Sequence, residues 1–298
     1  HAGQVSAQPR RAAGGTGQLN IGDGVGQSAV HAGRFEVGAG STVNINAGGT
    51  LNISSLGSAN AATGLDRAVY VAQQVGSAGT LVLGNLATLQ ADFVGVGVNA
   101  KAASTGGTLV QSNGAAGTLV LNNSTVNTKH FELGRDSLLT GNGDIVAGVD
   151  GPVVIGGTIS PGNSPGRIRI RCDVTMLLGS RLILEIDGSG ANVEIDQLII
   201  GDDSTFDLKN LQIVFAFIGD TNPEAVSLDL NEFLLSETPE GETSSLAALF
   251  GKNGNPNGWE SAVSSDLFAF QSSAYDVTAW KFNENGTITG VQASEIPE

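Results

Sequence analysis

The chain has too few cysteines for a disulfide and no long apolar run. Its 298 residues include one cysteine, Cys172, so no internal disulfide can form. We interpret Cys172 as a small buried side chain, because the arginines just before it are weak grounds for a reactive thiol. No apolar run approaches the roughly 18 residues of a membrane helix. The sequence therefore predicts no membrane span in this chain.

Charge and aromatic rings are also scarce. Charged residues make up 14 % and aromatic residues 5 % of the chain, whereas a charged share of about 25 % is usual. Residues 1–171 carry 10 basic and 8 acidic side chains, and residues 172–298 carry 4 basic and 21 acidic ones. No basic stripe is present to neutralise phosphates, so the composition disfavours nucleic-acid binding. The acidic half suits solubility, cation binding or a basic partner.

What the chain does have is glycine, at 43 residues, and short apolar alternation. Apolar pairs spaced by two begin at Leu19 and are typical of strands with one buried face. The intervening residues expected to face outward are Asn20, Glu36, Asn44 and Asn52. Helical spacing is almost absent, and only residues 65–75 and 243–250 suggest short helices.

Two recurrences indicate how the strands are arranged. A Gly-Thr unit followed by Leu or Ile recurs at Thr50, Thr80, Thr108, Thr118 and Thr158. A second echo relates residues 34–38 to residues 130–134. Short strands that recur with glycine corners are typical of solenoids. The sequence therefore predicts an all-β fold, a parallel β-solenoid with a C-terminal β-rich cap or extension.

A proline- and glycine-rich corner at residues 156–166 divides the chain. The strand expected after it alternates Ile168 and Ile170 with arginines. Eleven of the 15 aromatic residues follow residue 171. We predict a flexible segment over residues 1–18, the solenoid over 19–204, and an acidic, aromatic-richer β region over 205–298. Asn285-Gly286 lies in a turn that predicts a final hairpin between residues 279–281 and 287–289.

Several stretches resemble known exported proteins. Residues 157–166 resemble a corner of β-helical autotransporter passengers, and residues 184–188, 195–201 and 233–235 resemble strands that follow it there. The end of the chain, from Trp280 through residues 288–291 to Ile296-Pro297-Glu298, resembles the final hairpin of exported proteins of the PEP-CTERM class, although its closing motif is partial. The resemblance implies a β-helical fold and an extracellular or cell-surface location. A chain that starts at His1 with no Met fits an exported product whose signal peptide has been removed. It implies no activity.

The best candidates for chemistry are acidic side chains: Glu185, Asp187, Glu194, Asp196, Asp202 and Asp203. In the first two pairs the acids sit at i and i+2 and share a strand face. They could bind Ca²⁺ or act as acid and base on a sugar chain. The simplest interpretation, which we favour, is a solvated face, with Leu184, Ile186, Val193 and Ile195 pointing inward. No other cofactor is predicted.

Nucleophilic catalysis has little support, because His1, His31 and His130 are far apart in sequence and no Gly-x-Ser-x-Gly elbow occurs. We therefore predict a structural or adhesive protein of the bacterial surface or matrix rather than an enzyme. Its expected partners are extracellular polysaccharide or the cell envelope. Two states stay open: copies joined end to end into a fibre through the solenoid ends, and a monomer displayed at the cell surface and capped by residues 205–298. The alternative is a lyase or glycosidase acting on polysaccharide from a β-helical scaffold.

Overall fold

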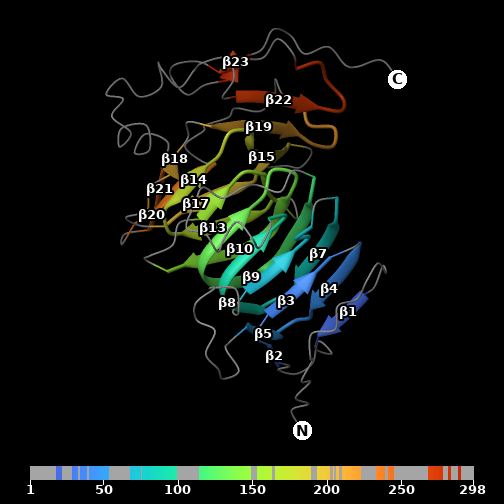
Figure 1. The fold of residues 1–298 in the computed structure, drawn as a ribbon. Helices are drawn as coiled ribbons and strands as arrows, with labels where there is room; N and C mark the ends of the chain where they lie inside the picture. The colour runs from blue at the N-terminus through green and yellow to red at the C-terminus, as the bar shows by residue number, and fades with distance from the viewer. Residues whose placement is uncertain are drawn as a thin grey trace.

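The computed structural model is all-β. It describes residues 18–21, 29–32, 34–38, 40–53, 68–74, 76–98, 114–148, 153–162, 165–188, 193–201, 204, 206–207, 210–222, 233–238, 241–244, 268–277, 281–282 and 288–289. These residues form 24 strands and no helix, and 22 of the strands belong to one mainly parallel sheet (Figure 1). The described part of the chain thus offers no apolar helix of membrane-spanning length.

The parallel pairings fall into three series, which we call ladders A, B and C. Ladder A joins β1 (Gln18–Ile21), β4 (Ser41–Ile45), β7 (Ala78–Leu83), the start of β9 (Ala116–Leu133), the start of β10 (Leu138–Ala147), β12 (Thr158–Pro161), β15 (Ser180–Asp187), β19 (Leu211–Phe217) and β22 (Phe268–Ser272). Ladder B joins β2 (Ala29–Ala32), β5 (Thr50–Ile53), the start of β8 (Thr88–Val96), the middle of β9, the end of β10, β13 (Arg167–Arg171), β17 (Gln197–Ile200) and β20 (Leu234–Thr238).

Ladder C joins β3 (Arg34–Val37), β6 (Ala68–Val71), the ends of β8 and β9, β11 (Val153–Ile155), β14 (Val174–Met176) and β18 (Phe206–Asp207). Antiparallel pairs are few: β16 (Glu194–Ile195) on β15, β21 (Gly241–Ser244) on β20, and the separate hairpin of β23 (Lys281–Phe282) and β24 (Ile288–Thr289). The chain visits A, B and C in turn and then returns to A, a pattern consistent with a β-solenoid.

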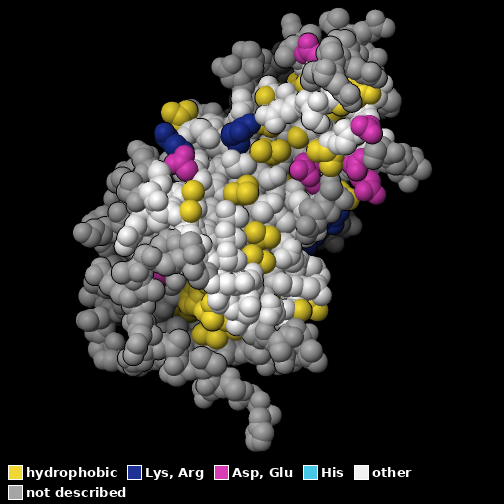
Figure 2. Space-filling view, turned by 90° about the vertical axis from the view of Figure 1, so that its right-hand side faces the viewer, with side chains coloured by type: hydrophobic (Ala, Val, Ile, Leu, Met, Phe, Trp, Pro, Cys, Tyr) yellow, Lys and Arg dark blue, Asp and Glu magenta, His cyan; other side chains and the backbone are white. Residues whose placement is uncertain are grey.

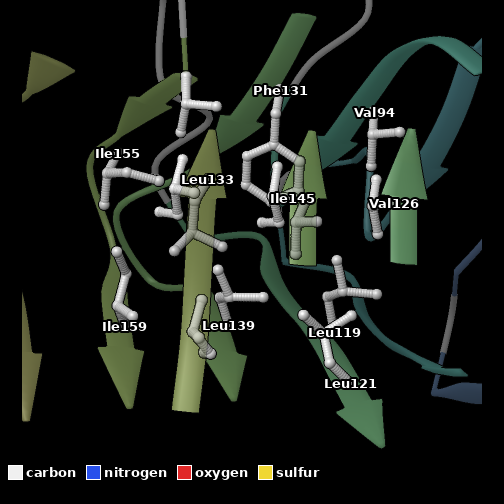
Figure 3. Packing of buried hydrophobic residues seen from close by; sticks show 14 of the residues in the cluster. Val94, Leu119, Leu121, Val126, Phe131, Leu133, Leu139, Ile145, Ile155 and Ile159 are labelled. Atoms are coloured by element: carbon white, nitrogen blue, oxygen red, sulfur yellow. The ribbon is translucent and has the colours of Figure 1, made fainter. Parts of the chain in front are cut away.

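Buried and more exposed side chains alternate along the strands, so the apolar side chains of the three ladders point into a shared interior. In β15 every second residue is buried, and the same holds along the first part of β9. Figure 3 shows side chains of β8, β9, β10, β11 and β12, among them Val94, Leu119 and Ile159, converging on one core. The core is mainly Val, Ile and Leu, because branched aliphatic side chains pack closely on pleated surfaces.

Corners between ladders rely on two local devices. Before ladder A strands, a four-residue turn ends in a serine whose N–H donates to the carbonyl three residues earlier, at Ser41, Ser77, Ser137 and Ser180. At the A-to-B corner of β10 the chain requires glycine. A Cβ on Gly141 would lie 1.9 Å from the carbonyl oxygen of Leu121, and Gly141 has φ of 99°. The neighbouring strand β9 therefore passes too close to residue 141 for any side chain there.

Several sequence predictions are confirmed by these pairings. The two similar segments around Phe35 and Phe131 lie in ladder C, and the two phenylalanines belong to one row with two strands between them. The Arg167–Arg171 strand alternates as expected, with Ile168 and Ile170 fully buried. The final hairpin pairs Lys281 with Thr289.

The two suggested helices are wrong where the structure describes them. Residues 68–71 form β6, and residues 241–244 form β21. Ala-Val-Tyr-Val in β6 is buried at every position, so apolar residues that resembled a helical stretch are instead a strand covered on both sides. Residues 245–250 lie outside the described residues.

Candidate functional site

The predicted acidic cluster is only partly assembled. β15 and β16 are antiparallel neighbours, and Asp187 stands directly opposite Glu194. Asp202 and Asp203 lie outside the described residues. Among the described residues no three His, Cys, Asp or Glu side chains are grouped so as to hold a metal ion. Calcium binding that involves Asp202 and Asp203 stays a prediction.

Asp196 corrects the expectation that these acids form one solvated face. Its side chain is fully buried, whereas Val193, expected to point inward, is 41 % exposed. Asp196 Oδ1 accepts a hydrogen bond from Gly166 N–H at 2.6 Å, and Oδ2 accepts one from Glu185 N–H at 2.9 Å. The short strand β16 ends before Asp196, so the i, i+2 alternation that the prediction assumed does not continue.

Asp196 links two elements through hydrogen bonds. It ties the corner that ends at Gly166 to β15, and its own N–H donates to the Glu185 carbonyl at 3.0 Å. Burial raises the pKa of Asp196 to about 7, although the two backbone hydrogen bonds oppose that shift. A carboxyl so enclosed cannot reach a polysaccharide, so its role is to hold the corner in place.

A second cluster lies on the outer side of ladder C. His130 Nε2 and Glu132 Oε1 are 2.7 Å apart, and the Glu132 side chain is only 5 % exposed. Phe93 stacks on the His130 ring at 5.5 Å, and Tyr70 packs on Phe93 at 5.5 Å. The sequence interpretation missed this pair. The i, i+2 spacing of His130 and Glu132 on one strand could have revealed it.

The outer side of ladder B carries a charged network. Arg169 Nη1 lies 3.3 Å from Asp144 Oδ1, and Arg171 Nε lies 3.1 Å from Glu237 Oε2. The hydrogen bond from Arg171 lowers the pKa of Glu237 and raises that of Arg171. This network therefore ties β10, β13 and β20 together across the surface.

The outer side of ladder A is different in chemistry. From β4 to β12 its outward residues, which we call the neutral face, are half-buried and uncharged: Thr42, Asn44, Thr80, Val82, Thr118, Val120, Leu138, Thr140, Thr158 and Ser160. The side of Figure 1 where β1, β4 and β7 lie faces the viewer in Figure 2. There, white surface, which comprises the backbone and the side chains that are neither hydrophobic nor charged, predominates, and the hydrophobic side chains form separate groups.

Cys172 is half-buried rather than fully enclosed. Burial raises the pKa of its thiol to about 11, and two backbone hydrogen bonds partly offset this. The thiol therefore stays protonated near neutral pH, where only the thiolate is a strong nucleophile. The geometry assigns it no chemistry.

Comparisons of the chain with models of protein families, with curated proteins and with solved structures find no match. Function is therefore inferred from the geometry and from the chemistry of these surfaces.

Proposed function

We propose that the chain is a parallel β-solenoid that serves as an exported structural or adhesive element of a bacterial surface or extracellular matrix. The observation that carries the proposal is the unbroken register of the ladders, with ladder A running from β1 to β22. Interior strands of each ladder are hydrogen-bonded on both sides, which gives a stiff support. A stiff support of this kind can hold the outer sides of the ladders in fixed positions for contact with a partner.

Stacked side chains on the outside add to this stiffness. Asn44 Nδ2 donates to Asn20 Oδ1 at 2.7 Å, and Asn123 Nδ2 donates to Asn85 Oδ1 at 2.9 Å. On ladder B, Asn52, Gln90 and Asn127 occupy one row. Amide ladders of this kind stabilise flat, regularly repeated strands. They support a scaffold role.

Export and cell-surface location rest on composition and on resemblance. Low charge and abundant glycine accord with an extracellular β protein, and the corner at residues 157–166 resembles those of autotransporter passengers. The partial motif at residues 296–298 resembles the end of PEP-CTERM proteins. Antibody labelling of intact source cells before and after protease treatment tests this: signal lost on protease treatment is expected, and signal only after lysis would contradict it.

End-to-end self-association belongs to the same proposal. The half up to residue 171 is nearly neutral, and the remainder carries 21 acidic against 4 basic side chains. Head-to-tail contact avoids bringing two acidic ends together, and a heterologous contact that does not close produces a filament. Negative-stain electron microscopy of the purified chain should show rods that join end to end. Light scattering that reports only monomer at high concentration, across salt and calcium conditions, would remove the fibre from the proposal.

A polysaccharide-acting enzyme is the second candidate, and the His130–Glu132 pair is the observation that favours it. A histidine held by a carboxylate can move protons in a reaction. The test is release of new sugar ends from soluble polysaccharides by the wild-type chain and by His130→Ala. Release that the variant loses supports an enzyme, and absence of release by the wild type leaves the structural role.

A further inference from the structure

We propose that the neutral face of ladder A is a binding surface for uncharged polysaccharide packed as a solid or fibre. This inference deepens the adhesive function proposed above and rests on it. It names both the surface that makes the contact and the chemical class of the partner.

The three outer sides of the molecule differ in what they can bind. On ladder C, Ala68, Tyr70 and Phe93 are outward in register yet 8 % exposed or less. On ladder B, the row of Thr50, Thr88 and Thr125 meets Asp144 and then Arg169, and the row of Asn52, Gln90, Asn127 and Val146 meets Arg171. Among the described residues, only ladder A has two uncharged, half-exposed rows that cross five successive strands.

Regular spacing makes the neutral face suited to a repeating partner. Neighbouring strands lie about 4.8 Å apart, so five strands span about 19 Å. Thr42, Thr80 and Thr118 are in direct register, and Thr158 continues the row beyond Leu138. Each threonine hydroxyl can both donate and accept a hydrogen bond. The face thus repeats hydroxyl groups along the ladder, as a packed polysaccharide repeats its own.

Charge decides the class of partner. The chain has a net charge of −15, yet none of the ten outward residues of the neutral face is charged. Charged side chains first enter these rows at Arg181 on β15, next to Thr158. An anionic polymer would find no counter-charge here, and burying its charges without partners would be costly. An uncharged polysaccharide loses only hydrogen bonds to water, which hydroxyl groups can replace.

Small apolar groups complete the match. Val82 and Val120 stand side by side in register, and Leu138 lies in the adjacent row on the next strand. A sugar ring presents C–H groups on its faces and hydroxyl groups at its rim, so separated apolar groups among hydroxyl groups complement it. Figure 2 shows the hydrophobic groups of this side spaced apart rather than merged into one patch.

The test uses the full-length chain and a matched pair of variants. Thr80→Lys places a charge in the middle of the neutral face. Thr88→Lys places the same charge on ladder B, where Thr88 is also half-buried and has Thr50 and Thr125 as in-register neighbours. Depletion of protein from solution is measured with microcrystalline cellulose, insoluble β-1,3-glucan, starch granules and, as the anionic arm, alginate beads. Circular dichroism and urea midpoints check that both variants fold alike.

We expect depletion by at least one neutral solid, unaffected by raised salt, and about a tenfold weaker apparent affinity for Thr80→Lys, with Thr88→Lys unchanged. Depletion only by alginate, depletion by none of the solids, or equal losses in the two variants would overturn the proposal. Cell-surface labelling and rod shape are measured separately, so failure of this face can be told from failure of the structural role.

Discussion

The middle of the chain, residues 114–188, and the part from residue 193 to residue 277 use the same ladders in different ways. In the middle, ladder A returns every 20 residues, from Leu119 to Leu139 to Ile159. Later, Leu182 pairs with Ile213 and Ile213 with Phe268, which are 31 and 55 residues apart. The returns to ladder A are therefore short in the middle and longer in the later part.

Core chemistry differs accordingly. The core of the middle consists of aliphatic side chains and one aromatic side chain, Phe131. In the later part the Phe215 ring packs against three others, with ring centroids 5.3 to 6.1 Å apart: Phe233, Phe268 and Phe270. Outward residues there are also enclosed: Ile199 and Val214 are fully buried. Outward surface open to a partner is therefore more extensive in the middle, where Val120 and Thr140 stay half-exposed.

The largest expected effect comes from placing charge in the middle core. Ile168 is fully buried in β13, so Ile168→Asp should lower the free energy of unfolding by about 3–5 kcal/mol. Ile168→Val, which removes one methylene, should cost about 1 kcal/mol. Urea denaturation measures both, and similar small losses for the two variants would place Ile168 at the surface.

Protonation of Asp196 provides the next effect, at the junction of the two regions. Its pKa is about 7 when folded and about 3.9 when unfolded, so between these values the folded chain binds the extra proton. The contribution of Asp196 to stability should therefore be greatest below pH 4 and fall by about 2–4 kcal/mol as pH rises to 7. Asp196→Asn should lose this fall. If the stability of the wild type relative to Asp196→Asn instead rises over that range, the backbone hydrogen bonds outweigh burial.

Glycine corners give a smaller effect that separates close approach from backbone strain. Gly141 and Gly179 both have positive φ, but a Cβ on Gly179 would meet nothing within 4 Å. Gly179→Ala should cost about 1 kcal/mol from conformation alone, and Gly141→Ala about 2–3 kcal/mol more because rungs must separate. Equal urea midpoints for the two variants would mean that the rungs are not packed as closely as described.

The smallest effect should come from the surface network of ladder B. Arg171 and Glu237 are partly exposed, with 43 % and 28 % of their side chains accessible. Arg171→Ser should therefore change stability by less than about 1 kcal/mol, and raised salt should shrink the difference further. A loss comparable to that of Ile168→Asp would show that this network, rather than the core, holds β20 to the sheet.

Local patterns in the sequence are sufficient to predict strands, but they do not predict to which ladder each strand belongs. Alternation identified the buried faces of β4, β5 and β13, because the side-chain period of a strand is fixed. The Gly-Thr units were found, yet the structure puts Thr80, Thr118 and Thr158 in ladder A, Thr50 in ladder B, and Thr108 outside the described residues. Which strands pair depends on the number of residues between successive strands of a ladder. That number varies along the chain, so a recurring Gly-Thr unit does not by itself predict the pairing.

The candidate site was predicted less well, for a related reason. Face assignment by i, i+2 spacing held for Glu185 and Asp187 on the long strand β15, which stay half-exposed. It failed for Glu194 and Asp196, because β16 has only two residues and the chain turns the second acid inward. The His130–Glu132 pair and the neutral face both depend on register between strands far apart in sequence, which no local pattern contains.

The measurement that tests the central claim most directly is a distance along ladder A. With Cys172 replaced by serine, spin labels at Thr42→Cys and Thr158→Cys would report on positions that are 116 residues apart in sequence but four strands apart in the ladder. Electron–electron double resonance should give a narrow distribution centred near a backbone separation of about 19 Å. A distribution centred at twice that distance or beyond would contradict the stacked parallel ladder and the neutral face built on it.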